Sequence, residues 1–359
     1  MRFLPLLVVV VVSAGGHALV SGPNGDFGGI YTDHLRHLAE SQALVARGSA
    51  IYRQPYAEAT QGLLPCPEHT GLFPERTAPY PPLGVLLHWP LGALERHQLL
   101  SPATSHQLTA TAWLICGLCA VWLAWRLVTS QLPGRLGLVL IVAPLTIGVG
   151  ANGFYDTTFL LAGVGALVLL ASKRPEWAML ALGLAAALHF RALVFAPVGL
   201  WALLEALRRD RRRALAFLGV SGLLVASAAW AAWHLSGTLD TIPADNPVHA
   251  SHLLHARAPL RFLVIAAVAV GSLVAWRARW TALTVVAAVL VAMSDRSYGF
   301  WHALPLIVPP LVVAAEQGAD RRAAWVAWGW TLAAVLGAFL YPFTAPWQWL
   351  ADVVAGRLR

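Results

Sequence analysis

Apolar runs that recur along almost the whole chain are the feature that most constrains its fold. Several runs approach the roughly 20 residues that an α-helix needs to cross the hydrocarbon core of a bilayer, and the shorter ones indicate tilted or broken helices around a cavity. Because a backbone inside a membrane must satisfy its own hydrogen bonds, such runs are expected to be helices. The sequence therefore predicts an all-α fold, a polytopic transmembrane helical bundle. After a first run at 3–20, the expected spans lie at about 105–128, 135–150, 156–172, 176–189, 190–207, 213–233, 260–276, 280–294, 301–316 and 323–341.

The composition favours a single integral membrane domain over residues 1–359. Hydrophobic residues make up 58% of the chain and charged residues only 12%, whereas soluble proteins are about 45–50% apolar and about 25% charged. The net charge of +8 could indicate nucleic-acid binding. However, the basic residues lie in short connections between apolar runs, which is typical of cytoplasmic anchoring. We therefore expect membrane lipids, and no nucleic acid, among the partners.

The first apolar run has two interpretations. Its small residues at 14–18 resemble a cleavage site, which would make the run a signal peptide. An uncleaved first helix is the preferred interpretation, because a multispanning chain needs no removable signal.

A polar break at 22–80 follows the first run and is predicted to be a long outer loop. Thr32 can cap a helix that begins near Asp33, and Leu35, Leu38 and neighbouring apolar residues form a stripe along it. Gly48 is expected to end this helix. The pattern predicts an amphipathic helix on the membrane surface. The next apolar segment, 80–97, is short and is interrupted by Pro90.

The distribution of arginine predicts the topology. If the amino terminus lies inside and 80–97 does not cross, the basic run Arg208–Arg213 falls inside, as the positive-inside rule requires. This arrangement has about eleven spans and a second outer loop at 234–259. It also brings four polar segments to the outer face, where ionisable groups at membrane depth indicate a functional cavity. These segments are the first loop, the turn 150–156, the junction 189–191 and the segment 294–302.

Several short motifs in these segments occur in one order in a known family. They are Tyr31-Thr-Asp33 with Gly48 and Ile51-Tyr52, Tyr80-Pro-Pro-Leu83, Asn152-Gly-Phe-Tyr-Asp156, the segment 183–191 and the segment 295–305. Together they resemble the membrane glycosyltransferases of the GT-C fold, over about residues 1–316. Those enzymes take a sugar from a polyprenyl-phosphate carrier.

The resemblance implies a function, partners and a location. It implies transfer of a hexose, for which mannose is one choice, from a polyprenyl-phosphate donor to a hydroxyl of a glycan, lipid or protein acceptor. It implies a bacterial inner (plasma) membrane with the active site facing the periplasm. No cofactor is certain, a divalent cation is left open, and no metal-ligand set is assigned.

Such a transfer needs a base and a group that holds phosphate. Asp33 is the first choice for the base and Asp26 the second, although either could instead be a helix cap. Arg191 and Arg296 are the expected phosphate-binding residues, because a guanidinium offers forked donors to phosphate oxygens. The further candidate binding residues are His189, His302, Asp156 and Tyr80.

Two other classes of function remain open on the sequence. A transporter or flippase for lipid-linked sugars could use the same cavity, and a non-catalytic membrane protein could keep the same residues for structure. No internal repeat suggests the inverted halves of a transporter, and transport does not need the long first loop. Arg191 could also serve only as the ion-pair partner of Asp156.

Overall fold

The computed structural model describes residues 30–63, 80–128, 132–151, 153–235, 258–294, 300–317 and 320–335. Every regular element in these ranges is a helix, which confirms the all-α prediction. Asp26, Arg296, the first apolar run and most of the second outer loop lie outside the described residues.

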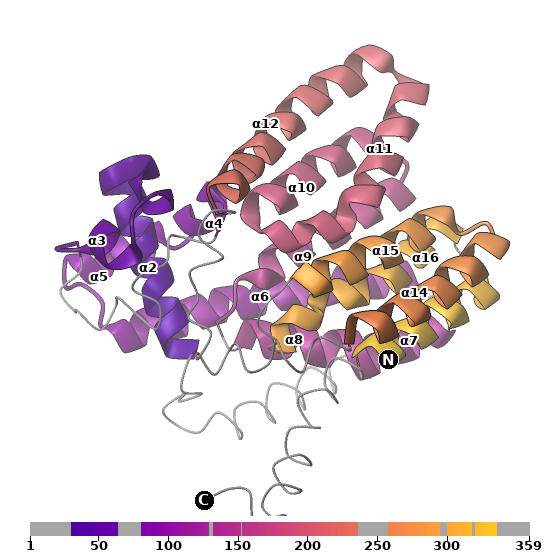
Figure 1. The fold of residues 1–359 in the computed structure, drawn as a ribbon, viewed down its shortest axis with the longest axis horizontal. Helices are drawn as coiled ribbons and strands as arrows, with labels where there is room; N and C mark the ends of the chain where they lie inside the picture. Colours follow the sequence, from indigo (N-terminus) through magenta and orange to yellow (C-terminus); the bar gives the residue numbers. More distant parts are fainter. Residues whose placement is uncertain are drawn as a thin grey trace, which may run out of the picture.

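The first loop and the segment after it fold into a group of short helices at one end of the bundle (Figure 1). The longest of these helices, α2, stops where Gly48 adopts a φ of +57°, a left-handed conformation that glycine accepts at little cost. Proline occupies the first turn of both α4 and α5, where its missing N–H is not needed. The elements of this group are α2 (Ile30–Arg47), η1 (Gly48–Tyr52), α3 (Tyr56–Thr60), α4 (Pro82–Leu86) and α5 (Trp89–Arg96).

Helix α2 differs from its prediction in two respects. It begins at Ile30, ahead of the predicted start near Asp33. All residues from His37 to Ala43 are buried, polar as well as apolar, so burial is not confined to the predicted apolar stripe. The reason is that α2 packs against α4, α5 and α6 and does not present a polar face to solvent in this stretch.

The remaining helices form the main bundle. The longest is α6, and α9 packs against both α6 and α10. Their bounds are α6 (Pro102–Val128), α7 (Leu132–Gly137), η3 (Leu138–Val142), α8 (Ala143–Ala151), α9 (Asp156–Ala171), α10 (Pro175–Leu188), η4 (Phe190–Phe195), α11 (Ala196–Arg209), α12 (Arg211–Leu235), α14 (Ala258–Ala275), α15 (Arg279–Ser294), η6 (Phe300–Ile307) and α16 (Val308–Gln317). Residues 321–335 are helical as well.

Within the described residues, 4 helical segments are long and apolar enough to cross a membrane: Thr104–Val128, Leu132–Ala151, Phe190–Arg209 and Arg211–Trp230. Five other apolar helices are shorter, among them Asp156–Ala171 and Pro175–Leu188. A helix of 16 residues such as α9 is about 24 Å long, less than a hydrocarbon core of about 30 Å. A membrane protein is therefore supported, and the number of about eleven crossings stays a prediction.

The break between α10 and α11 confirms the predicted junction at 189–191. His189 is extended, with φ −155° and ψ 139°, and its ring nitrogen Nδ1 accepts a hydrogen bond of 3.0 Å from the Arg191 backbone N–H. The chain then continues as a 3₁₀-helix, η4, before α11 begins. The junction thus presents His189 and Arg191 at the end of α10.

A close backbone contact holds α4 against this junction. A Cβ added at Gly84 would lie 2.2 Å from the Leu188 carbonyl oxygen, the last residue of α10. Only glycine therefore allows α4 to reach this position.

We expect Gly84→Ala to lower the stability of the protein by about 1–3 kcal/mol, because the backbone must move to admit the methyl group. Gly219→Ala is the matched control, since Gly219 lies in α12 with nothing within 4 Å of the added Cβ. That variant should be neutral or slightly stabilising, as alanine is the better helix former. Thermal unfolding of both variants in detergent checks the difference, and equal midpoints would contradict the proposed contact.

Candidate functional site

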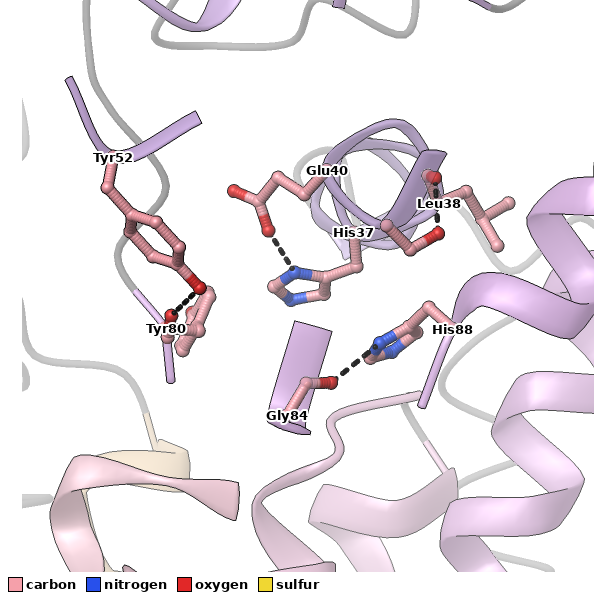
Figure 2. Close-up of polar contacts among 8 residues, drawn as sticks. His37, Leu38, Glu40, Tyr52, Tyr80, Gly84 and His88 are labelled. Carbon is pink, nitrogen blue, oxygen red and sulfur yellow. Dashed lines mark hydrogen bonds and ion pairs between the residues drawn. The ribbon is translucent and has the colours of Figure 1, made fainter. Parts of the chain in front are cut away.

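A buried group of ionisable and aromatic side chains lies where the first-loop helices meet the main bundle. We name it the His–Tyr cluster and define it as His37, Glu40, Tyr80, His88, Tyr155, Asp156, His189 and Arg191. Figure 2 shows the part contributed by α2, Tyr80 and the α4–α5 segment. Ionisable groups this far from water are costly to bury, so their arrangement calls for a specific explanation.

Helix α2 contributes an acid and a base to the cluster. His37 Nδ1 lies 3.1 Å from Glu40 Oε2, and the two residues are 5% and 0% exposed (Figure 2). They are three positions apart, which places them on neighbouring parts of the helix surface. Gln42 Nε2 donates a hydrogen bond of 3.3 Å to the Trp89 carbonyl oxygen and so attaches α2 to α5.

His88 lies between α4 and α5 and is neutral at physiological pH. Burial, followed by the nearby His37, lowers its pKa to about 3. Its Nδ1 lies 3.3 Å from the Gly84 carbonyl oxygen, an acceptor, so Nδ1 carries the proton (Figure 2). The other nitrogen, Nε2, is left with a lone pair and makes no hydrogen bond to any described residue.

Tyr155 is at the centre of the cluster. The residue is 2% exposed, and its hydroxyl makes no hydrogen bond within the described part of the chain. A buried hydroxyl without a partner costs about 1–3 kcal/mol, so this oxygen is suited to accept or donate to a bound polar group. Its ring lies 5.2 to 6.4 Å from the rings of His37, Tyr80, His88, Trp113 and His189.

Asp156, in the first turn of α9, is the second acid of the cluster besides Glu40. It accepts a hydrogen bond from the Arg191 guanidinium, and the side chains are 5% and 11% exposed. Because His189 Nδ1 accepts from the Arg191 backbone, the proton of the neutral ring is on Nε2. That atom lies 3.4 Å from Asp156 Oδ1 but is not aligned for a hydrogen bond.

Tyr52, in η1, is not a member of the cluster but is hydrogen-bonded to Tyr80. Its hydroxyl donates a hydrogen bond of 3.0 Å to the Tyr80 carbonyl oxygen (Figure 2), and its ring contacts Trp230 at 5.3 Å. Burial, and then the negative charge of Glu40, raises the pKa of Tyr52. Its hydroxyl therefore keeps its proton and holds Tyr80 in place.

The structure brings four of the predicted site residues together: Tyr80, Asp156, His189 and Arg191. Asp33 lies in the first turn of α2, four residues before His37. His302 lies in η6, and Asp26 and Arg296 lie outside the described residues. The pairing of Arg191 with Asp156, left open by the sequence, is present.

Sequence reasoning did not assign His37, Glu40, His88 or Tyr155. One signal was available, since a histidine and a glutamate three apart on a predicted helix share a surface. Tyr155 lies within the motif at 152–156 but was not singled out there, and no local pattern marks His88; the two rings meet through a contact between distant segments.

No family model, no curated protein and no solved structure matches this chain. The chemistry must therefore be argued from its own residues. Among the described side chains, no group of three or more His, Cys, Asp or Glu is placed to hold a metal ion.

The Asp156–Arg191 pair can be tested by a double-mutant cycle. Arg191→Met should lower stability by about 3–5 kcal/mol, because it leaves a buried carboxylate without its cation. Asp156→Asn combined with Arg191→Met should recover much of that loss, since neither charge is then buried alone. Unfolding of the single and double variants in mixed micelles measures the coupling, and strictly additive losses would show that the pair is not coupled.

The buried neutral His88 predicts a pH dependence of stability. Its pKa rises from about 3 in the folded protein to its ordinary value of 6.5 on unfolding, so acid favours the unfolded state. The contribution is complete above about pH 7 and is lost as the pH falls through 6.5 towards 3, by up to about 1.4 kcal/mol per pH unit.

His88→Asn keeps a donor for the Gly84 carbonyl oxygen and removes the titrating ring. We expect the stability of this variant to fall less steeply than that of the wild type between about pH 6 and 4. Unfolding midpoints measured across this range give both slopes, and parallel curves would rule out titration of His88.

Proposed function

We propose that this chain is a membrane glycosyltransferase of the GT-C fold. It moves a hexose from a polyprenyl-phosphate carrier to an acceptor hydroxyl at the outer face of a bacterial inner membrane. The observation that carries the proposal is the His–Tyr cluster, in which α2, Tyr80, the turn before α9 and the junction after α10 meet. These are the segments whose motifs resemble that family.

The proposed reaction is a single displacement at the anomeric carbon. The acceptor oxygen forms a bond to that carbon from the side opposite the phosphate, and the carbon–oxygen bond to the phosphate breaks. The electron pair of that bond leaves with the polyprenyl phosphate, and the configuration inverts. A carboxylate takes the proton of the acceptor hydroxyl. In the proposal this base is Asp33, with Asp26 as the second candidate.

The position of Asp33 in the first turn of α2 supports this role. α2 is the helix that carries His37 and Glu40 into the cluster, and Asp33 is located about one helical turn before His37 along it. Asp156, an acid of the cluster, is already paired with the guanidinium of Arg191. Because an oxygen of Asp156 already accepts a hydrogen bond from Arg191, the proposal assigns the base to Asp33.

Arg191 and Arg296 are the proposed contacts of the carrier phosphate. The side chain of Arg191 is 11% exposed, so its charge acts where water screens it little. Phosphate can share the guanidinium with Asp156 or replace that carboxylate, because the fork of donors fits both anions.

The sugar would lie against the uncharged members of the cluster. Tyr155 offers a hydroxyl and His88 a lone pair, neither of which bonds to another described residue. Such groups can bind sugar hydroxyls without adding charge at the reacting carbon. His189, Tyr80 and His302 are further candidate contacts in this proposal.

The test is transfer by the purified protein reconstituted with a radiolabelled polyprenyl-phosphate hexose and an acceptor. Asp33→Asn should lower the transfer rate by about 10²–10⁴-fold, the usual contribution of a general base. Asp26→Asn measures the second candidate. Glu58→Gln is the matched control, because Glu58 is an exposed carboxylate of the same loop outside the cluster, and its transfer rate should not change.

Other outcomes would contradict parts of the proposal. Undiminished transfer by Asp33→Asn would remove Asp33 as the base. Movement of the labelled lipid across the membrane without a glycosidic product would indicate a flippase. Neither transfer nor movement by the folded wild-type protein with any hexose carrier would indicate a non-catalytic role.

A further inference from the structure

A pocket of about 640 Å³ lies at the opposite end of the helices that build the His–Tyr cluster. Asp156 opens α9, whereas Leu170, near the end of the same helix, lines this pocket. A helix of 16 residues separates its ends by about 24 Å, so the pocket is distinct from the cluster. Its volume is within the range of about 300–1,000 Å³ found for ligand sites.

The lining of this pocket is basic and aromatic. Four cations converge from three separate parts of the chain: the turn after α9, the last residue of α11, and the turn between α14 and α15 together with the first residue of α15. The lining residues of interest are Lys173, Arg209, Arg277, Arg279, Trp201, Trp280, Glu205 and Glu316. Cations from distant parts of the chain repel one another, so their convergence needs a reason beyond anchoring.

The two carboxylates of the pocket are bound to other groups. Glu316 accepts hydrogen bonds of 3.1 and 2.9 Å from the backbone N–H groups of Trp280 and Thr281, where it caps the start of α15. Glu205 pairs at 3.0 Å with Arg208, which does not line the pocket. Lys173, Arg209 and Arg279 form no ion pair with any residue that the structure describes, so the pocket has an excess of positive charge.

Two of these cations, Lys173 and Arg277, occupy backbone positions with positive φ at the rim of the pocket. Lys173 and Arg277 have φ of +59° and +62°, a left-handed conformation in which glycine is the usual residue. Both follow the last turn of a helix in the same way, with a backbone hydrogen bond reaching back five residues: Arg174 to Leu169 and Ala278 to Leu273, each 2.8 Å. The same turn therefore places both Lys173 and Arg277 at the rim of the pocket.

The aromatic residues give the pocket a firm wall. The rings of Trp201 and Trp280 are stacked, with centroids 6.2 Å apart and planes at 10°, and the Arg279 guanidinium lies 5.3 Å from the Trp280 ring centroid. This contact orients Arg279 without neutralising it. Tryptophan and basic residues at the ends of apolar helices are typical of the level of lipid headgroups.

We propose that this pocket binds a phosphate group through Lys173, Arg209 and Arg279. The phosphate belongs either to the headgroup of an anionic lipid or to a free phosphorylated compound, since the same donors recognise both. The site is independent of the proposed glycosyl transfer, because its residues lie at the far ends of α9 and α11.

The test measures binding by the full-length protein in nanodiscs of phosphatidylcholine, with and without phosphatidylglycerol, and separately with inorganic phosphate in detergent. A basic side chain near the membrane surface contributes about fivefold to the binding of an anionic lipid, so Lys173→Gly with Arg279→Ala should weaken binding about thirtyfold. Lys173→Gly also relieves the strain at φ +59°, and the variant should therefore fold at least as well as the wild type.

Two controls match these changes. Gln98→Gly replaces another non-glycine residue of positive φ, 57°, that does not line the pocket, and Arg321→Ala removes an exposed cation elsewhere. Neither should change binding. If the wild type retains phosphatidylglycerol and the double variant does not, the site binds a lipid headgroup. Saturable binding of inorganic phosphate indicates a soluble ligand. Equal binding by wild type and the double variant, or no binding of either probe, would overturn the proposal.

Discussion

The buried ion pair between Asp156 and Arg191 is the interaction on which the candidate site depends. Its members lie 35 positions apart, at the start of α9 and just after α10, and both are largely withdrawn from solvent. Either charge left alone there would cost several kcal/mol, so the two helix ends must stay together. Asp156 also lies in the first turn of α9, at the positive end of the helix dipole.

The pair in turn positions the rings that connect the first loop to the bundle. Tyr155 is adjacent to Asp156, and His189 lies two residues before Arg191. The ion pair therefore fixes the positions of both rings. His37, Tyr80 and His88 then pack on them with centroids about 5 Å apart. The side chains that hold α2 against the bundle are thus the same ones that could bind a polar substrate. Stability and function would therefore be coupled in this region.

The helices α9, α10 and α11 carry two chemically different ends. One end has acids, neutral histidines and tyrosines, and the other has an excess of arginine and lysine around stacked tryptophans. The basic end agrees with the cytoplasmic side expected from the arginine pattern. In the proposed protein, sugar transfer and phosphate binding would therefore take place on opposite sides of the membrane.

Much of the architecture followed from local patterns. The apolar runs predicted an all-α membrane protein, because an unbroken apolar stretch has few other stable structures in a bilayer. The junction at His189 and the end of α2 at Gly48 were predictable for the same local reason, a change in backbone preference. Tyr80, Asp156, His189 and Arg191 could be grouped because the charge pattern placed their segments on one side.

The tertiary structure decided which other side chains complete the site. His37, Glu40, His88 and Tyr155 belong to it through contacts between segments tens of residues apart, and hydrophobic periodicity carries no record of such contacts. The bounds of α9 and α10, by contrast, agree within one residue with the spans predicted at 156–172 and 176–189. By itself the sequence determined the class of protein and the polar segments. The meeting of the first loop, the turn 150–156 and the junction 189–191 in one buried cluster depends on helix packing, because that packing arises from many contacts between distant parts of the chain.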